Sequence, residues 1–304
     1  MYQRKFHNNK SSWSGPIAIG GVGGSGTRVV AEILIQLGFY LGKDHNSACD
    51  NLWFTLLFKR PRWFLKNSVR KESQIFKGLT LFEKAMTADV KFRYEELSFI
   101  IGAVVEMMFN GHDYLGAGRG LWPIKRGITM FRSKISDHAN YIGWGWKEPN
   151  THIYIEYLNK YFQNFKYIHL IRHGIDMAYS NNQSQLFNWG TMFGIAAHDV
   201  TIPLPRRSLK YWHEANKRAI TLGQKLLKDR FLVINFDKLC MNPAREIELL
   251  IDFLGLDTRG VKMDELQRLP RLPESYGRYK NYDLSIFSKD EIEAVEELGF
   301  VVDR

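Results

Sequence analysis

Residues 16–37 read PIAIGGVGGSGTRVVAEILIQL, and this stretch decides the fold. A short apolar run at 17–19 predicts a strand, and the apolar residues through 29–37 predict a helix. Between them, five of the seven residues at 20–26 are glycine. Glycine lets several backbone N–H groups point at one place, and a helix N-terminus adds partial positive charge there. The order of strand, glycine loop and helix therefore predicts a site for one or two phosphate groups.

The glycine loop differs from the two commonest phosphate-binding patterns. The spacing of its glycines fits GxxxxGK[ST], but Thr27-Arg28 stands where the lysine and the magnesium-binding hydroxyl belong. A P-loop kinase relative that phosphorylates a small molecule is therefore the weaker alternative. The pattern GxGxxG also occurs at 21–26, with Asp44 as the candidate for the acid that holds a dinucleotide ribose. A tight turn without a ligand is the remaining explanation.

The composition of the chain limits which kinds of ligand and which cellular location are expected. The chain has 304 residues, with 42 Lys and Arg against 32 Asp and Glu, which gives a net charge of +10. This excess of positive charge suits an acidic ligand, an anionic surface or nucleic acid. Two cysteines, Cys49 and Cys240, cannot form a disulfide framework, and the first 13 residues lack the apolar segment of a secretory signal. We therefore expect a cytoplasmic protein.

Three further strand patterns follow along the chain. Apolar runs at 141–146, 166–171 and 231–236 predict strands, and helical patterns alternate with them. This alternation predicts an α/β fold, in which helices flank a mostly parallel sheet and ligands bind at the carboxyl ends of the strands. We expect a single domain over residues 1–304, with a frayed start at 1–14 and a helical excursion at about 55–135.

Two features of the excursion have simple structural explanations. Lys59 to Lys71 is a basic segment, for which we expect a solvated face and at most a weak contact with an anionic surface. No RNA- or DNA-binding motif accompanies it, so we expect no nucleic-acid partner. A stripe of apolar residues at helical spacing is expected to be core. Its members are Leu97, Ile100, Ile101, Val104, Val105 and Met108.

Four motifs resemble those of the sulfotransferases that use 3′-phosphoadenosine-5′-phosphosulfate (PAPS), and they occur in the order typical of that family. They are the loop Gly24-Ser25-Gly26-Thr27-Arg28, the sequence Lys147-Glu148-Pro149 after a strand, Arg172 with Ser180 eight residues later, and the late segment 233–256. Gly277-Arg278-Tyr279 also resembles the cofactor-contacting loop near the C-terminus of the family. The motifs span most of residues 16–281 and mix features of the tyrosylprotein and heparan-sulfate types.

The resemblance implies a P-loop-type fold and a sulfotransferase activity. A sulfuryl group would pass in line from PAPS to a hydroxyl or amine, leaving adenosine 3′,5′-diphosphate, with no metal required. Most members carry Lys or Arg where this chain has Gly24, so Arg28, Lys147 or backbone N–H groups would replace that cation. The cofactor-binding residues that the resemblance implies are Gly23, Gly24, Ser25, Gly26, Thr27, Arg28, Arg172, Ser180 and Arg278.

Lys147 and Asp50 are the candidate catalytic residues. By the resemblance, Lys147 would meet the oxygen that leaves with the diphosphate, where negative charge develops. Asp50 aligns with a glutamate of the heparan-sulfate type and is the candidate base, although an ordinary Asp pKa of about 3.9 suits that role only if apolar neighbours raise it. The alternative for Asp50 is a helix N-cap. His45 is the rival base.

Several alternatives stay open. Arg172 has a structural explanation, an ion pair with Asp176. Because Gly24 departs from the family pattern, the chain could be a non-catalytic nucleotide-binding relative. The basic segment is compatible with a binding protein. The acceptor, whether a carbohydrate, a lipid, a small molecule or a peptide, depends on irregular segments at about 45–130 and 183–207 that carry no readable motif. The oligomeric state and the choice between O- and N-sulfation are open as well.

Overall fold

A computed structural model of the chain describes residues 15–89, 91–133 and 141–303. The expected frayed start at 1–14 and the last two residues of the expected excursion lie outside this part. The chain divides into two compact units. Among the described residues, the first unit comprises 15–18, 31–89, 91–133, 141–148 and Tyr154–Lys166. The second comprises Ile19–Val30, Pro149–Ile153 and 167–303.

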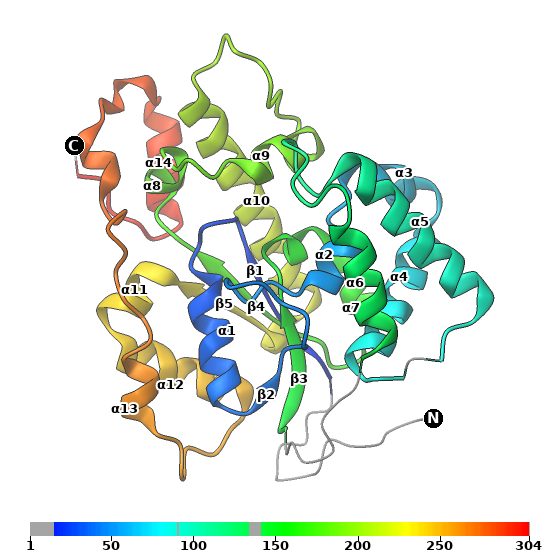
Figure 1. Ribbon diagram of the computed structural model, residues 1–304. Helices are drawn as coiled ribbons and strands as arrows, with labels where there is room; N and C mark the ends of the chain where they lie inside the picture. The colour runs from blue at the N-terminus through cyan, green and yellow to red at the C-terminus, as the bar shows by residue number, and fades with distance from the viewer. Residues whose placement is uncertain (1–14, 90, 134–140, 304) are drawn as a thin grey trace. The chain divides into compact units, whose positions relative to one another are not determined.

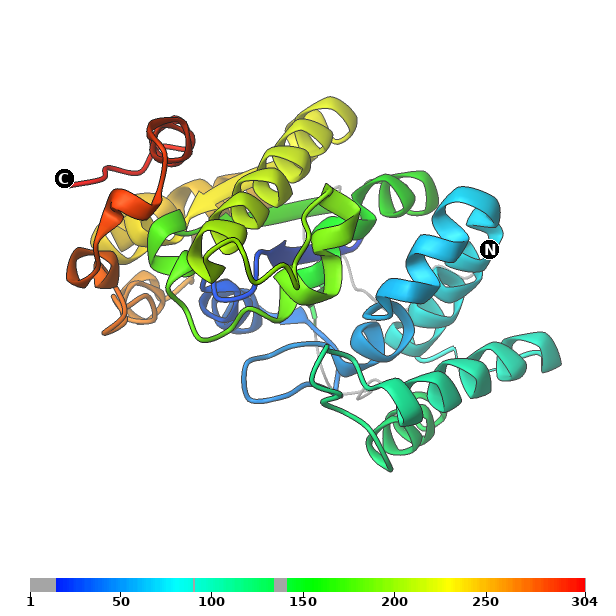
Figure 2. The ribbon, with the colours of Figure 1, turned by 90° about the horizontal axis from the view of Figure 1, so that it is seen from above.

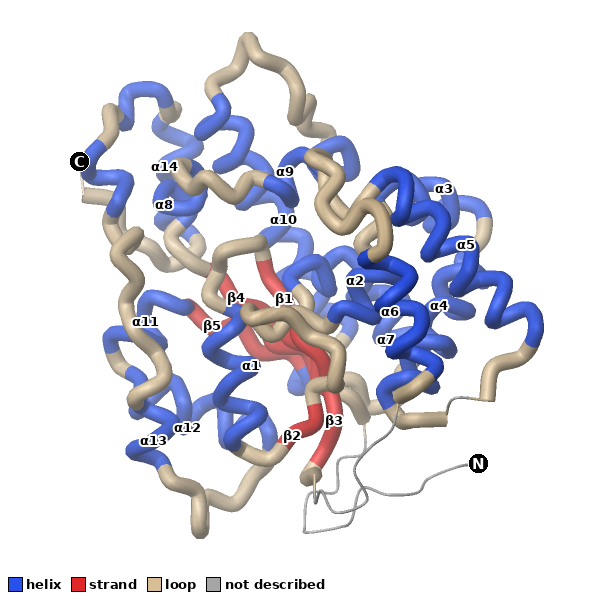
Figure 3. The backbone as a smooth tube through the Cα atoms, viewed as in Figure 1, coloured by secondary structure: helices blue, strands red, loops and turns tan. Residues whose placement is uncertain are grey.

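Five strands form one sheet in the order β2-β3-β1-β4-β5 (Figure 3). The strands are β1 (Ile17–Gly21), β2 (Phe39–Tyr40), β3 (Gly143–Lys147), β4 (Lys166–Ile171) and β5 (Phe231–Asn235). β2 runs parallel to β3 with Phe39 opposite Gly143, and β4 runs parallel to β5 with Tyr167 opposite Phe231. The parallel pairing and the flanking helices confirm the predicted α/β class. The two-residue strand β2 is an addition that no apolar run predicted.

Several helices lie in the first unit (Figure 1). Aromatic side chains pack between them. The ring of Phe54 stacks on Trp146 at 5.6 Å between centroids and meets Phe82 edge to face at 5.3 Å. The sequence Leu52–Phe58 is apolar on all sides, so every residue of that helix is buried. The helices are α2 (Leu52–Phe58), α3 (Pro61–Arg70), α4 (Glu72–Met86), α5 (Tyr94–Asn110), α6 (Trp122–Phe131) and α7 (Ile155–Tyr161).

The apolar stripe predicted as core on α5 is only partly buried. Ile100 is buried, whereas Ile101 is 61% and Val105 is 46% exposed. The prediction was wrong for Ile101 and Val105 because apolar residues occupy more of the helix circumference than the core covers. Periodicity finds an apolar face, but the packing partners decide which part of that face is buried.

The second unit is built on β4 and β5. Gly223 of helix α10 approaches β5 so closely that a Cβ atom there would lie 2.4 Å from the ring of Phe231. Asn216 of the same helix bonds His169 of β4 at 2.9 Å, and Figure 2 shows α10 passing over both strands. The helices of this unit are α8 (Gly174–Ala178), α9 (Ser184–Trp189), α10 (Leu204–Leu226), α11 (Phe236–Met241), α12 (Pro243–Leu254), α13 (Met263–Gln267) and α14 (Lys289–Glu297).

The remaining elements are one helix shared by the two units and short 3₁₀ turns. They are α1 (Thr27–Gln36) and η1 (Pro149–Tyr154), η2 (Gly190–Phe193), η3 (Lys228–Arg230), η4 (Arg278–Asn281) and η5 (Leu284–Ile286). Among the described helices, none combines the length and the apolar character that crossing a bilayer requires.

Candidate functional site

The glycine loop follows β1 and ends where α1 begins. Gly24 and Gly26 have φ values of +99° and +81°, which favour glycine. A Cβ atom on Gly26 would lie 2.0 Å from the ring of Phe236, so no larger residue fits. The backbone N–H of Ser25 donates to the carbonyl of Val22 at 3.0 Å and closes the turn. The loop therefore has a fixed conformation that depends on glycine at defined positions.

One residue of the glycine loop and one residue of the first turn of α1 are exposed to solvent. Gly24 is exposed, and a Cβ atom there would meet only the methyl group of Met177, at 3.7 Å. Arg28, in the first turn of α1, is exposed as well, whereas Thr27 is buried. The position where most members of the resembled family carry a cation is therefore sterically open in this chain.

Arg172 follows β4 and reaches the glycine loop. Its Nη1 donates to the carbonyl of Gly24 at 3.3 Å, and its Nη2 donates to Ser275 Oγ at 2.8 Å. Only 8% of Arg172 is exposed, and its Nε has no hydrogen-bond partner among the described residues. Burial lowers the pKa of this guanidinium from its ordinary value, and the charges of Asp237 and Asp176 oppose that shift. Arg172 is thus a buried cation that bonds neutral oxygens and has one N–H without a partner among the described residues. Such a group is suited to binding an anion.

Asp176 does not form the ion pair with Arg172 that was the alternative explanation for this arginine. Its two carboxylate oxygens accept the backbone N–H groups of Gly277 at 2.7 Å and Tyr279 at 3.0 Å. The described residues include no hydrogen bond between Arg172 and Asp176. Asp176 instead anchors the segment that carries Arg278.

Arg278 lies at the start of η4 and belongs to the same cluster. Its Nε donates to the carbonyl of Ser275 at 3.3 Å, and its Nη1 donates to the carbonyl of Tyr179 at 3.3 Å. The charge of Arg278 contributes to lowering the pKa of Arg172. Both guanidinium groups bond Ser275, and the carboxylates of Asp237 and Asp176 also act on Arg172. We call Arg172, Ser275 and Arg278 the arginine cluster.

Ser275 was missed by the sequence analysis, and Ser180, which was predicted, bonds a neighbour in the sequence. Ser275 comes three residues before Arg278, and this nearness to the Gly-Arg-Tyr motif is its only sequence signal. Ser180 lies just after α8, and its Oγ accepts the backbone N–H of Asn182 at 3.2 Å. Among the described residues, no hydrogen bond joins Ser180 to either arginine of the cluster.

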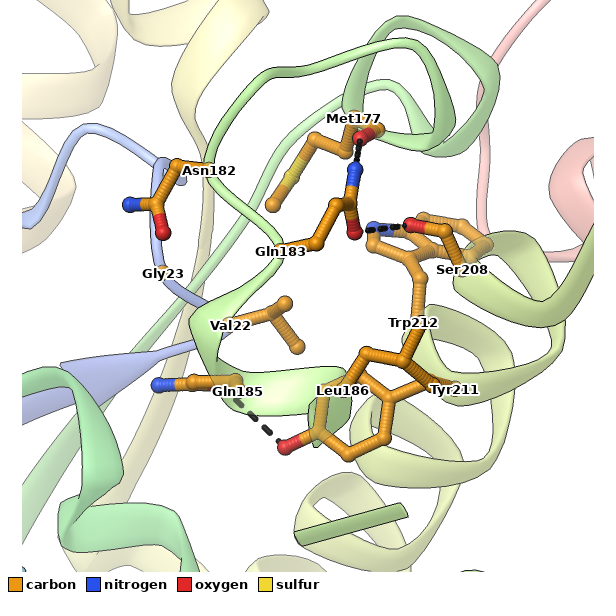
Figure 4. A pocket seen from close by; sticks show the side chains of 10 residues that line it. All are labelled: Val22, Gly23, Met177, Asn182, Gln183, Gln185, Leu186, Ser208, Tyr211 and Trp212. Carbon is orange, nitrogen blue, oxygen red and sulfur yellow. Dashed lines mark hydrogen bonds between the residues drawn. The ribbon is translucent and has the colours of Figure 1, made fainter. Parts of the chain in front are cut away.

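A small cavity in the second unit lies beside the glycine loop (Figure 4). Its volume of about 10 Å³ is room for about one water molecule, too little for a nucleotide or an acceptor. Gln183 accepts from Ser208 at 2.5 Å, and Gln185 accepts from Tyr211 at 3.2 Å while it donates to the carbonyl of Gly21 at 3.4 Å. These bonds fix the segment after Ser180 against the start of the loop.

Lys147 and Asp50 meet in the first unit. Lys147 is the last residue of β3, and its Nζ forms an ion pair with Asp50 and donates to the carbonyl of Ala48 at 2.9 Å. The Lys147 side chain is 3% exposed and that of Asp50 is 22% exposed. Asn46 Nδ2 donates to the second carboxylate oxygen of Asp50 at 2.9 Å. The structure thus brings the two predicted catalytic residues into contact.

The alternative that Asp50 is a helix N-cap is wrong, because the N-cap of α2 is the next residue, Asn51. Asn51 Oδ1 accepts the backbone N–H of Phe54 at 3.0 Å, in the position of an N-cap. Asp44, the candidate ribose-binding acid, is buried in an ion pair with Arg126 and accepts from Thr129. A buried structural carboxylate of this kind is no dinucleotide contact.

The histidines differ in their surroundings. His45, the rival base, is exposed, and its Nδ1 lies 3.3 Å from the carbonyl of its neighbour Asn46. His112, in a glycine-rich turn that no motif marked, accepts from Lys59 Nζ at 3.3 Å. Burial and the charge of Lys59 lower the pKa of His112 to about 4, against the opposing charges of Asp113 and Asp50. His112 is therefore a neutral group within electrostatic reach of Asp50.

His173 and His152, which flank the motifs, have structural surroundings. The His173 ring stacks on Tyr279 at 4.5 Å, and its Nε2 lies 3.1 Å from the carbonyl of Val301. His152 is fully buried, and its burial lowers its pKa well below the ordinary value. Its Nε2 lies 3.4 Å from Gln185 Oε1. These contacts agree with leaving both histidines out of the list of candidate bases.

The chain can be aligned with solved structures that are described as sulfotransferases. The sulfotransferase domain of the Synechococcus PCC 7002 olefin synthase aligns with a TM-score of 0.46 and 13% identity, over 99% of this chain and 100% of that one. The sulfotransferase domain of the curacin biosynthetic pathway aligns with 0.49 and 15%, over 96% and 100%. A sulfotransferase from Mycobacterium avium aligns with 0.47 and 13%, over 95% and 76%. No curated protein matches the chain significantly.

The match at the level of sequence is to a family model. The model described as the sulfotransferase family matches residues 16–260, which is more than half of the 304 residues. The matched range begins just before β1 and includes the glycine loop, Lys147 and Arg172. The chain therefore belongs to the sulfotransferase family.

Proposed function

We propose that the sulfuryl donor of this sulfotransferase is PAPS and that the arginine cluster binds its 3′-phosphate. The observation that carries the proposal is the buried guanidinium of Arg172. Its described hydrogen-bond partners are all neutral, and its Nε has no hydrogen-bond partner among the described residues. Guanidinium groups bind phosphate through paired N–H donors and keep their charge when buried. An anion at this place would satisfy the open N–H and offset the repulsion between Arg172 and Arg278.

The residues of the second unit fit a ligand that carries phosphates at two positions. Backbone N–H groups between Gly23 and Thr27, other than that of Ser25, would hold the 5′-phosphosulfate at the start of α1. Arg172, Arg278 and the hydroxyl groups of Ser275 and Ser180 would hold the 3′-phosphate. Arg172 bonds the carbonyl of Gly24, so it supplies positive charge at the loop position that lacks a side-chain cation. When bound, PAPS supplies the sulfuryl group.

The catalytic roles in the proposal belong to Lys147 and Asp50. Lys147 would neutralise the charge that develops on the leaving oxygen, as a cation does in phosphoryl transfer. Asp50 would take the proton of the acceptor hydroxyl or amine as the new bond to sulfur forms and the bond to the diphosphate breaks. In the structure the two side chains are paired with each other. Lys147 would therefore exchange one anionic partner for another during transfer.

The test of the proposal is calorimetric binding of adenosine 3′,5′-diphosphate and of AMP. We expect micromolar or tighter binding of the first and clearly weaker binding of the second. The variant Arg172→Gln should lose this preference, with about a 10- to 100-fold weaker binding of the bisphosphate, as for loss of a charged hydrogen bond. Arg245→Gln changes an exposed arginine of α12 and serves as the matched control. Equal affinity of the wild-type chain for both nucleotides would refute the 3′-phosphate assignment.

A further inference from the structure

An apolar row lies on the solvent side of α5. Ile101, Val105 and Phe109 follow one another at intervals of four residues, which places them on one helix face. Phe109 is 73% exposed, and Tyr94, at the first turn, is exposed too. A helix on the surface of a soluble domain normally turns polar residues to this side. A contiguous exposed apolar row therefore indicates a surface that binds something.

The row runs between two neighbouring helices of the same unit. On one flank, the ring of Trp63 in α3 lies 5.9 Å from the ring of Phe99 in α5. On the other flank, a Cβ atom on Gly127 of α6 would lie 3.2 Å from Val104. The apolar row of α5 is thus bordered by α3 and α6.

Both bordering helices are basic and lack acidic residues. On α3, Arg62 and Lys66 are exposed on the face that also exposes Leu65 and Val69. Near α6, Lys125 and Arg132 are exposed beside Ile128. We group these exposed residues of three neighbouring helices under the name basic–apolar face. Its members are Arg62, Leu65, Lys66, Val69, Ile101, Val105, Phe109, Lys125, Ile128 and Arg132.

The carboxylates of α5 do little to reduce this charge. Glu106 forms an ion pair with Arg60 at 2.8 Å, and Glu96 is buried against Lys84 at 2.9 Å. Glu95 is the exposed one, at the first turn. Some residues of the basic segment Lys59 to Lys71 do not belong to the basic–apolar face. Lys59 bonds His112, and Arg60 is buried.

We infer that the basic–apolar face binds the surface of an anionic lipid bilayer. Apolar side chains that enter the interface, bordered by Lys and Arg that meet the headgroups, are the combination that interfacial helices use. A second copy of the chain fits less well, because a symmetric contact between two such faces would bring like charges together. The inference is independent of the donor and of the residues proposed for catalysis.

Vesicle flotation of the full chain tests the inference. We expect the protein to float with vesicles of phosphatidylcholine and phosphatidylserine and to stay behind with phosphatidylcholine alone. Added salt should weaken the binding, because it screens the attraction between exposed charges. Absence of flotation with the anionic vesicles at low salt would overturn the inference.

Two variants separate the contributions. Lys66→Gln with Lys125→Gln should weaken the partition onto anionic vesicles about 25-fold, or about fivefold for each basic residue. Val105→Ser with Phe109→Ser should weaken it at least about tenfold by removing the apolar part. Both pairs change exposed side chains, and circular dichroism checks the fold. Val200→Ser with Lys225→Gln, exposed positions in the second unit, is the matched control and should float like the wild type.

Three results would contradict the inference. One is an apolar variant that floats as well as the wild type, which would leave only unspecific charge attraction. Another is a wild-type dimer in sedimentation that the apolar variant converts to a monomer, which would make the face a contact between copies. The third is binding to soluble polyglutamate as strong as to the vesicles, which would point to an acidic macromolecule.

Discussion

Lys147 is almost fully buried, yet it carries a charge that one carboxylate balances. Its Nζ has the Asp50 carboxylate and one carbonyl oxygen as partners. A lysine held in this way keeps its position at the end of β3 with little freedom. In the proposed mechanism this cation would stabilise developing negative charge as it exchanges Asp50 for the leaving oxygen.

The variant Lys147→Ala should lose sulfuryl transfer and keep nucleotide binding. We expect transfer from labelled PAPS to fall at least about 100-fold, as when a charge-stabilising group is removed from a transition state. The assay uses an acceptor found by screening carbohydrates, lipids, small molecules and peptides. The affinity for adenosine 3′,5′-diphosphate should change little, because Lys147 bonds Asp50 and Ala48 and no residue of the arginine cluster. Lys160→Ala, an exposed lysine paired with Glu72, is the control, and unchanged turnover of Lys147→Ala would remove Lys147 from the mechanism.

The variant Gly26→Ala should damage the glycine loop. The added Cβ would overlap the Phe236 ring, and the φ of +81° is unfavourable for alanine. We expect about a 5- to 150-fold loss of nucleotide affinity, because overlap with a ring displaces the loop at a cost of about 1–3 kcal/mol. Gly194→Ala has a similar φ of +67° with no atom nearby, so it should reduce stability by about 1 kcal/mol and leave affinity unchanged. Equal behaviour of the two variants would contradict the role of the close contact.

At the scale of elements, α8 positions the C-terminal loop. Asp176 in α8 holds the backbone of Gly277 and Tyr279, and His173 just before α8 stacks on the ring of Tyr279. The loop carries Ser275 and Arg278 to Arg172. The arginine cluster therefore depends on a contact between two segments that are about a hundred residues apart in the sequence.

The variant Asp176→Asn should loosen this loop. An asparagine side chain offers one acceptor oxygen, so one of the two backbone N–H groups would lose its partner. We expect a five- to 30-fold weaker binding of adenosine 3′,5′-diphosphate, about 1–2 kcal/mol, with the weak binding of AMP unchanged. Amide exchange at residues 277 and 279 should become faster. Asp252→Asn on α12 is the control, and an equal loss for both nucleotides would argue against a role confined to the 3′-phosphate.

Local elements could be predicted from the sequence, and elements made by distant partners could not. The apolar run and the glycines of 17–26 are sufficient for a strand and a loop because their signal is local. β2 is a strand only because Phe39 and Tyr40 pair with β3. Asp50 and Asn51 are both residue types that cap helices, so the cap could not be assigned without the structure. Ser275 and His112 gain their importance from contacts that no spacing reveals.

At the scale of the whole molecule, buried histidines make stability depend on pH. His169 is fully buried, with Tyr167 at 3.0 Å and Asn216 at 2.9 Å from its ring nitrogens. Burial lowers its pKa to about 4, against the effect of the hydrogen bond to Asn216. The unfolded chain therefore takes up a proton at higher pH than the folded chain does. The stabilisation from the neutral ring is complete above pH 6.5 and is lost as the pH falls toward 4.

The variant His169→Gln should flatten this dependence. The wild type should lose about 3 kcal/mol of unfolding free energy through His169 alone between pH 7 and pH 4, a loss that the variant lacks. Urea denaturation at a series of pH values measures the slope, which matters here more than the absolute stability. His198→Gln, an exposed position, is the control and should keep the wild-type slope. Parallel curves for His169→Gln and the wild type would contradict the assignment.

Arg172 reaches Ser275 across 103 residues of sequence. β5 and helices α10 to α13 are all synthesised before Ser275 and Arg278 exist. A nascent chain that has grown only as far as β5 therefore contains Arg172 without the hydroxyl and the second guanidinium that surround it in the finished fold. If the cluster is the nucleotide site, the ligand can stabilise the chain only after residue 278 has been added, so the early stages of folding proceed without it.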